Sequence, residues 1–270
     1  MTINWSHMAD GKSCPNCTAD GSTANKVYVT LATPTDTVYL TSLHLAVSSD
    51  GATNNTQAIN KSWAFFGNGT APTNVKGWDN RPFIYYPAGT PFSGCATSIV
   101  ALLTTPTGGA RCGAFAQFFQ NVLAMNGIAS VITVVDPAED SGMLVKNWTY
   151  KATPSFPASP QYKWSFVTVG FNEMVPAPAA GGVYGDMTSG SGVPGENSPT
   201  PSEKAHINHA IVKAPDTGVY YDPSYGLTYS GAADFETKAL DGYILHVPGD
   251  PNTQYRVRKS TGLNKATFTP

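Results

Sequence analysis

The most regular apolar pattern in the chain lies in residues 108–127, GGARCGAFAQFFQNVLAMNG. Its large apolar side chains recur at positions i, i+3, i+4, i+7 and i+8, namely Phe115, Phe118, Phe119, Val122 and Leu123. This spacing predicts a helix from about Cys112 to Asn126 that packs one face into a core. Asn126-Gly127 supplies the residues that commonly end a helix in the left-handed conformation. A Gly-Gly loop precedes the helix, so Cys112 is expected in its first turn.

The first turn of a helix is a favourable place for a reactive thiol. Backbone N–H groups are unpaired there, and the positive end of the helix dipole stabilises an anion, which lowers a thiol pKa. The functional interpretation of Cys112 is therefore a nucleophile, and the alternative is a small buried residue at the start of a core helix. Cys95 follows Gly94 without a comparable context and is assigned no role.

The composition excludes two classes of partner. The chain of 270 residues has 16 Lys and Arg against 18 Asp and Glu, a net charge of −2, and only 13% charged residues. This balance lacks the basic surface that binds nucleic acid or anionic membranes. No apolar run approaches the roughly 20 residues that cross a bilayer. We therefore expect no nucleic-acid and no membrane partner, and the composition carries no signal for an oligomeric state.

Low charge combined with many Thr, Ser, Asn, Gly and Pro residues favours turns and short strands. We expect a secreted or extracytoplasmic protein whose signal peptide is absent from this sequence. Cys14 and Cys17 form a C-x-x-C pair, for which a local disulfide, two free thiols, and a metal or redox pair remain open. No second ligand pair and no calcium-binding loop pattern is present, so we expect no metal and no cofactor.

The predicted organisation is a polar tail over residues 1–25 followed by a single α+β domain over 26–270. Alternating apolar residues over 27–31 and 37–48 predict an N-terminal β-hairpin. Helical spacing is found over 53–66, and a short apolar helix is expected over 97–103. A long Pro-, Gly- and Ser-rich loop spans 173–204 and is expected to form a lid or rim. Strands are predicted over 82–86, 129–135, 145–150, 162–171, 210–212, 219–222, 243–247 and 255–259.

A thiol nucleophile needs a base, and His209 has the most informative context. The segment His209 to Asp222 is predicted to form a β-hairpin that turns at Pro215-Asp216-Thr217-Gly218. If Lys213 pairs with Gly218, His209 and Asp222 lie opposite each other with Cβ atoms about 5 Å apart. The carboxylate would then fix the imidazole tautomer and leave the other ring nitrogen for a thiol. A shift of two residues would leave the pair diagonal, and a shift of one would place them on opposite faces. The alternative is an exposed hairpin with an incidental His.

Together these segments resemble the transglutaminase-like cysteine superfamily. The resemblance rests on the Cys112 helix, on Gly127-Ile128 at its end, on His209-Ala210, and on Asp222-Pro223-Ser224-Tyr225-Gly226, in the order Cys, His, Asp. It covers about residues 96–136 and 205–227. It implies a papain/transglutaminase-like core in which the nucleophile-bearing helix packs against an antiparallel sheet. It further implies Cys112 as nucleophile, His209 as base and Asp222 as the residue that orients the base.

The resemblance also implies an oxyanion donor upstream of the cysteine. Trp78 is the preferred candidate, with Trp63, Tyr85 and Tyr86 as alternatives, and His206 is an alternative base. The expected activity is acyl transfer on peptide or protein amides through a thioester, with peptide-bond hydrolysis favoured. Crosslinking or deamidation of protein glutamine is the first alternative. A non-catalytic surface or binding module on the same fold is the second.

Overall fold

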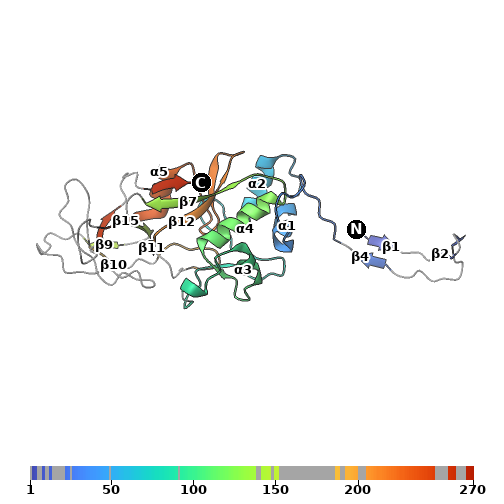
Figure 1. The fold of residues 1–270 in the computed structure, drawn as a ribbon, viewed down its shortest axis with the longest axis horizontal. Coiled ribbons are helices and arrows are strands. Elements are labelled where there is room, and N and C mark those ends of the chain that lie inside the picture. The colour runs from blue at the N-terminus through green and yellow to red at the C-terminus, as the bar shows by residue number, and fades with distance from the viewer. Residues whose placement is uncertain are drawn as a thin grey trace, which may run out of the picture.

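The computed structural model describes residues 2–4, 8–9, 12–13, 22–24, 26–48, 50–90, 92–137, 141–146, 149–151, 186–188, 192–199, 205–246, 255–259 and 266–270. These residues form an α+β fold, with helices packed on antiparallel sheets (Figure 1). Cys14, Cys17, the strand predicted over 162–171 and most of the loop over 173–204 lie outside the described residues.

Two antiparallel sheets make up most of the β-structure. The larger sheet has the order β14 (Leu227–Tyr229), β13 (Val219–Asp222), β12 (His209–Ala214), β7 (Val131–Pro137) and β17 (Ala266–Thr269). The second sheet has the order β11 (Ala205–His206), β8 (Ser141–Val145), β15 (Leu240–His246) and β16 (Tyr255–Lys259). The predicted strands over 129–135, 210–212, 219–222, 243–247 and 255–259 are confirmed as β7, β12, β13, β15 and β16.

The remaining strands form short pairs. β5 (Ile84–Tyr85) runs parallel to β6 (Gly109–Ala110), which confirms the strand predicted over 82–86. β1 (Thr2–Asn4) pairs with β4 (Ser22–Ala24), and β2 (Met8–Ala9) pairs with β3 (Lys12–Ser13). The strand predicted over 145–150 overlaps two strands of the structure. Val145 is the last residue of β8, and Thr149 and Tyr150 belong to β9 (Thr149–Lys151), which pairs with β10 (Asp186–Thr188).

The central helix is α4 (Cys112–Ala124), which packs against β12. Its predicted bounds are confirmed, and Gly127 takes the left-handed conformation with φ +70°. α1 (Leu40–Val47), α2 (Asn55–Trp63) and α3 (Ile99–Thr104) contact α4. Asn54 and Ser98 cap α2 and α3, which confirms both predicted helices. α5 (Ala232–Ala239) lies beside β14, β15 and β17, and a short 3-10 turn, η1, spans Phe92–Gly94.

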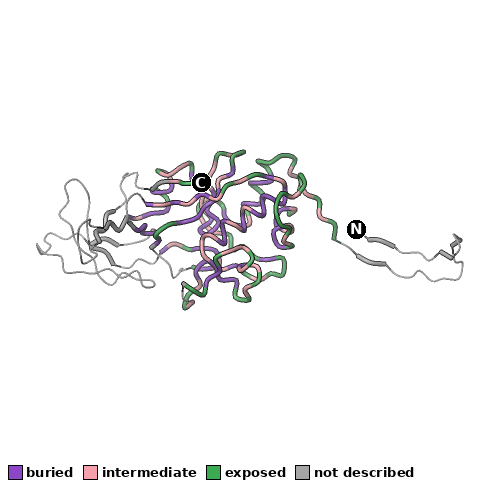
Figure 2. Tube along the Cα trace, in the orientation of Figure 1, coloured by how far each residue is buried: buried purple, intermediate pink, exposed green. Residues whose placement is uncertain are grey.

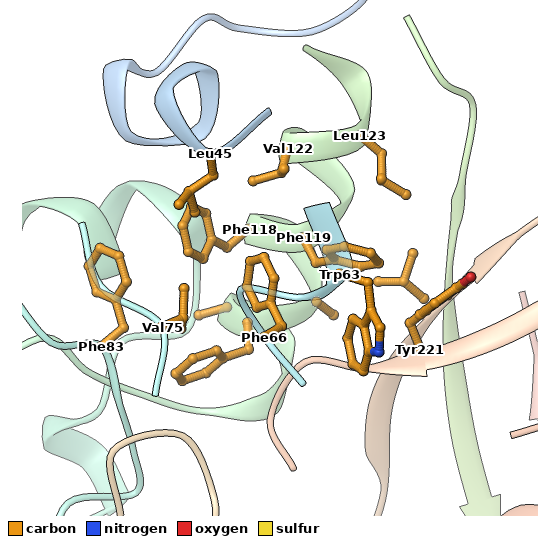
Figure 3. Packing of buried hydrophobic residues seen from close by; sticks show 14 of the residues in the cluster. Leu45, Trp63, Phe66, Val75, Phe83, Phe118, Phe119, Val122, Leu123 and Tyr221 are labelled. Carbon is orange, nitrogen blue, oxygen red and sulfur yellow. The ribbon is translucent and has the colours of Figure 1, made fainter. Parts of the chain in front are cut away.

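Aromatic side chains of α4 form the centre of the main core (Figure 3). Phe118 and Phe119 each lie edge-on to Phe66, with ring centroids 5.2 and 5.1 Å apart. Trp63 meets Phe119 at 5.3 Å and Tyr221 of β13 at 5.0 Å. Figure 2 shows α4 and the strands beside it as largely buried. This packing fixes the direction of α4, and therefore the place of Cys112 at its start.

The hairpin predicted over residues 27–48 is wrong. Residues 26–39 contain no strand, and residues 40–47 form α1. Thr41, Ser42, Leu45 and Ala46 are buried, a helical spacing that includes small and polar residues. The alternation of Val38, Leu40 and Leu43 with Thr and Ser suggested a strand, but Val38 precedes the helix and is exposed, and Leu40 is exposed in the first turn of the helix.

Candidate functional site

Cys112 is placed by a loop that is held on both sides. The N–H of Ile84 donates to the Gly108 carbonyl at 2.8 Å, and the N–H of Tyr86 donates to the Ala110 carbonyl at 3.1 Å. Gly108 has φ +66°, and a Cβ there would lie 2.2 Å from the Pro82 carbonyl oxygen, so only glycine fits. Cys112 is then the first residue of α4, as predicted, and it is partly exposed.

His209 and Asp222 come together through a register that differs from the predicted one by two residues. Lys213 pairs with Tyr220 and Ala214 with Val219, instead of Lys213 with Gly218. The four-residue turn is therefore Pro215–Gly218. Because the shift is even, both side chains stay on the same face. His209 Nε2 lies 2.9 Å from Asp222 Oδ2, and both residues are buried.

The Asp222 carboxylate accepts hydrogen bonds at both of its oxygens. Tyr229 Oη donates to Oδ2 at 3.0 Å, and the backbone N–H groups of Ser224 and Tyr225 donate to Oδ1 at 3.1 and 3.3 Å. These donors stabilise the ionised carboxylate and fix its direction. His209 therefore donates from Nε2, and its Nδ1, which has no partner of ordinary hydrogen-bond geometry among the described residues, is left for the thiol.

Electrostatics favour a proton on the imidazole rather than on the sulfur. Burial raises the pKa of the Cys112 thiol, but the hydrogen bond and charge of His209, with a backbone hydrogen bond from Ala210, outweigh burial and lower it below its ordinary value. Burial lowers the pKa of His209, yet the charge and hydrogen bond of Asp222, together with Cys112, raise it to about 10. Both shifts favour the state in which a thiolate lies beside an imidazolium.

A second group of aromatic and imidazole rings lies against His209. The ring of His206 is 5.4 Å from the His209 ring, and His206 Nε2 is 3.1 Å from Tyr225 Oη and 3.5 Å from Tyr85 Oη. The Tyr85 ring is 6.5 Å from the His209 ring. His206, the alternative base, lies at the site but carries no carboxylate partner among its described contacts.

Trp78, the preferred oxyanion candidate, is not brought to this group. Trp78 is 53% exposed and lies in the turn closed by the hydrogen bond between Gly77 and Arg81. Among the described contacts, it makes none with Cys112, His209 or Asp222. Trp63 is in the main core against Phe119. Two alternatives do lie near the imidazoles, with Tyr86 6.2 Å from His206 and Tyr85 in hydrogen-bond reach of it.

Residues 192–199 contribute a buried carboxyl group that sequence reasoning missed. The N–H of Tyr85 donates to the Glu196 carbonyl at 2.8 Å, and the N–H of Glu196 donates to the Ser224 carbonyl at 2.9 Å. Glu196 Oε2 accepts from the N–H of Val75 at 2.7 Å. Burial raises the pKa of Glu196 to about 9, although nearby backbone N–H groups lower it. The segment connects the Tyr85 strand to the turn after Asp222. Its only sequence signal is a single Glu in a Pro- and Gly-rich loop.

Other kinds of site are not found in the described part of the chain. No group of three or more His, Cys, Asp or Glu side chains there could hold a metal ion. None of the described helices is both long and apolar enough to cross a membrane. Cys95 is buried.

No family model, curated protein or solved structure matches this chain. Functional inference therefore rests on the site itself. Cys112, a partly exposed residue at a helix start, lies with the buried His209–Asp222 pair in a Cys–His–Asp arrangement of the residue types that nucleophilic thiol catalysis uses.

Proposed function

We propose that the protein transfers acyl groups from peptide or protein amides through Cys112, with hydrolysis of a peptide bond as the net reaction. The observation that carries this proposal is the buried His209–Asp222 hydrogen bond of 2.9 Å next to Cys112, a partly exposed residue whose thiol pKa is lowered by His209. A core cysteine without a function has no need of a buried imidazole–carboxylate pair, which costs desolvation.

In the proposed reaction the Cys112 thiolate attacks the amide carbonyl carbon, forming a C–S bond and placing the negative charge on the carbonyl oxygen. The His209 imidazolium gives its proton to the amide nitrogen, the C–N bond breaks, and the amine leaves. Water then attacks the thioester while His209 takes a proton from it. The C–S bond breaks, the acid is released and the thiolate is restored. The N–H of Cys112 at the helix start and the Tyr85 hydroxyl are the proposed donors to the oxyanion.

The finer fold assignment belongs to the same proposal. We infer a papain/transglutaminase-like core because the nucleophile-bearing helix packs on an antiparallel sheet whose strands carry the imidazole and the carboxylate. The order Cys112, His209, Asp222 along the chain supports the resemblance.

Peptide products distinguish the possible outcomes. The protein is incubated with a peptide library and a free primary amine, and products are identified by mass spectrometry. New cleavage supports hydrolysis, a deamidation mass shift or an amine adduct supports glutamine chemistry instead, and Cys112→Ala is expected to abolish the product. Cys95→Ala is the matched control and should retain it.

The proposal fails if Cys112→Ala leaves every product unchanged, or if no product forms and Cys112 is alkylated as slowly as Cys95. That second outcome would favour a non-catalytic module.

A further inference from the structure

The second imidazole at the site is held by two tyrosine hydroxyl groups at once. His206 Nε2 is 3.1 Å from Tyr225 Oη and 3.5 Å from Tyr85 Oη, and all three side chains are buried. The rings of Tyr85 and Tyr225 are themselves 4.9 Å apart and edge-on. The three residues come from β5, β11 and the turn after β13, so the contact is made by the fold and not by neighbours in sequence.

One imidazole nitrogen makes one good hydrogen bond in the plane of the ring. The nearer hydroxyl, Tyr225, takes that bond at 3.1 Å, whereas the Tyr85 hydroxyl stays at the limit of hydrogen-bond distance. The described contacts give the Tyr85 hydroxyl no other hydrogen-bond partner, so its proton remains available to a further acceptor.

The Tyr85 side chain lies among the residues of the candidate site. Tyr85 pairs with Ala110, two residues before Cys112, and its ring meets Phe115 of α4 at 5.9 Å and His209 at 6.5 Å. Burial, and then the charges of neighbouring groups that include the Cys112 thiolate, raise the pKa of Tyr85, so the hydroxyl keeps its proton. Burial and the charge of His209 lower the pKa of His206, so this imidazole is neutral.

We propose that His206 is a positioning residue: by binding Tyr225 it keeps the Tyr85 hydroxyl directed at the oxygen of the substrate carbonyl. Without the His206 nitrogen, the two tyrosine hydroxyl groups would bond to each other, and Tyr85 would turn away from the reacting oxygen. This inference rests on the proposed acyl transfer. It adds the buried imidazole of His206, which acts on the reaction through Tyr85.

The test compares two reactions of the same sulfur. Acylation by p-nitrophenyl acetate develops a negative charge on the carbonyl oxygen, whereas alkylation by iodoacetamide does not, so only the first needs an oxyanion donor. Rates are measured on the full chain, as p-nitrophenol release above the Cys112→Ala background and as alkylation of Cys112 by peptide mapping.

The shape-preserving variant His206→Phe removes the nitrogen and keeps a planar ring. We expect it to slow acylation by roughly 10- to 100-fold, the same factor as Tyr85→Phe, and the double variant to be no slower. His206→Gln, whose amide can replace the nitrogen, should restore most of the rate. Alkylation should change by less than about twofold in each variant, because no oxyanion forms. The matched controls are Tyr221→Phe, whose buried hydroxyl bonds Thr217 instead, and His44→Gln in α1.

The inference is overturned if a folded His206→Phe acylates at the wild-type rate, if the effects of His206→Phe and Tyr85→Phe multiply, or if alkylation falls equally with acylation. If His206→Phe does not fold, Tyr225→Phe decides. In Tyr225→Phe, the His206 Nε2 bonds the Tyr85 hydroxyl and draws it away from the substrate, so the acylation rate should fall. An unchanged acylation rate would refute the positioning role of His206. Failure of the proposed function looks different, because wild-type Cys112 would then react with neither reagent above the Cys112→Ala background.

Discussion

At the scale of single residues, Asp222 decides the state of the imidazole. Its carboxylate accepts hydrogen bonds from His209, Tyr229 and two backbone N–H groups. Asp222→Asn would remove the negative charge and direct an amide group at one of these donors. We expect acyl transfer to fall by roughly 10³- to 10⁴-fold, as when the orienting carboxylate of a triad is lost. The rate of product formation measures this. Asp216→Asn, on the exposed turn of the same hairpin, should change the rate little, and an equal loss there would contradict the assigned role.

The thiol and the imidazole predict a characteristic pH dependence. The pKa of Cys112 is lowered from its ordinary value of 9.0 and that of His209 is raised to about 10, so the ion pair exists between the lowered pKa of the thiol and about pH 10. Amide hydrolysis should rise with pH as the thiolate forms below pH 9, and fall near pH 10 as His209 loses the proton that the leaving amine needs.

Alkylation of Cys112 needs only the thiolate and should show the rise without that fall. In His209→Gln the midpoint of the rise should move to higher pH, because the charge of His209 no longer offsets the effect of burial on the thiol. The rate of Cys112 alkylation, measured by peptide mapping at pH values from about 5 to about 11, checks the prediction. An unchanged midpoint in the variant would contradict it.

Glu196 predicts a loss of stability with rising pH. Its pKa is raised from 4.5 to about 9, so the folded protein keeps a proton that the unfolded chain releases above pH 4.5. The stability of the fold is therefore highest, as far as this group is concerned, below pH 4.5, and decreases until about pH 9. Glu196→Gln should become stabilising relative to the wild type as pH rises, by roughly 6 kcal/mol between the ends of this window. Urea unfolding at several pH values measures the difference. A difference independent of pH would show that Glu196 is ionised in the fold.

At the scale of elements, the turn after β13 holds Asp222 in place through a close backbone contact. Gly226 has φ +67°, and a Cβ there would lie 2.3 Å from the Ala71 carbonyl oxygen. Gly218, in the hairpin turn, has φ +68° but nothing within 4 Å of a Cβ. Gly218→Ala should cost only about 1–2 kcal/mol of backbone strain. Gly226→Ala should cost more than about 3 kcal/mol and reduce acyl transfer, since the Asp222–Tyr225 turn must move. Urea unfolding compares the two, and equal costs would contradict the argument.

Prediction of elements from sequence succeeded where one periodicity dominates. The five large apolar residues of α4 and the Gly127 terminator left one interpretation, and the bounds agree. α1 was misread because its buried face includes Thr41 and Ser42, which a hydrophobic pattern does not count. α5 was not predicted, since its eight residues bury mainly Phe235 and Ala239. The predicted hairpin register differs from the observed one by two residues. Turn residues indicate roughly where the chain reverses, but they do not determine which two residues form the last pair before the turn.

The candidate site was predictable to a similar extent. Cys112, His209 and Asp222 each lie at an element end that local patterns identify, and the structure places His209 and Asp222 in contact. The supporting residues were not accessible in this way. Tyr85 and His206 meet through pairings between distant segments, 121 residues apart, and no local pattern encodes that contact. The sequence offered several aromatic residues upstream of Cys112 as oxyanion donors, and Trp78, the preferred one, is 53% exposed and makes no described contact with this cluster.

At the scale of the whole molecule, the site lies where two hydrophobic clusters meet. The larger surrounds α4, and the smaller contains Val135, Ile211 and Phe235 with their neighbours from both sheets. His209 touches both, with its ring 5.6 Å from Tyr225 of the first cluster and 6.3 Å from Phe235 of the second. The imidazole is therefore fixed only when both clusters are packed, which couples the integrity of the second sheet to the position of the His209 ring beside Cys112 at the start of α4.

At the same scale, the strands β1 and β4 differ from residues 31–37 in their relation to the body of the protein. β1 and β4 are drawn apart from the helices and sheets of the body (Figure 1), whereas residues 31–37 bond to the end of α4. The N–H of Leu31 donates to Asn126 Oδ1 and the N–H of Thr35 to the Ala124 carbonyl, both at 3.0 Å. Deleting residues 1–25 should therefore leave the free energy of unfolding within about 0.5 kcal/mol of the full chain and the alkylation of Cys112 unchanged.

Deleting residues 1–39 would also remove the bonds that Asn121 makes to Asp36 and Thr37 at 3.0 Å, and would leave buried polar groups on α4 without partners. We expect this longer deletion to cost roughly 2–4 kcal/mol, since each unpaired buried group costs about 1 kcal/mol or more. Urea unfolding of the two truncated chains beside the full chain provides the measurement. Equal destabilisation by both deletions would show that the body depends on residues 1–25, and would move the N-terminal boundary of the domain from residue 26 towards the start of the chain.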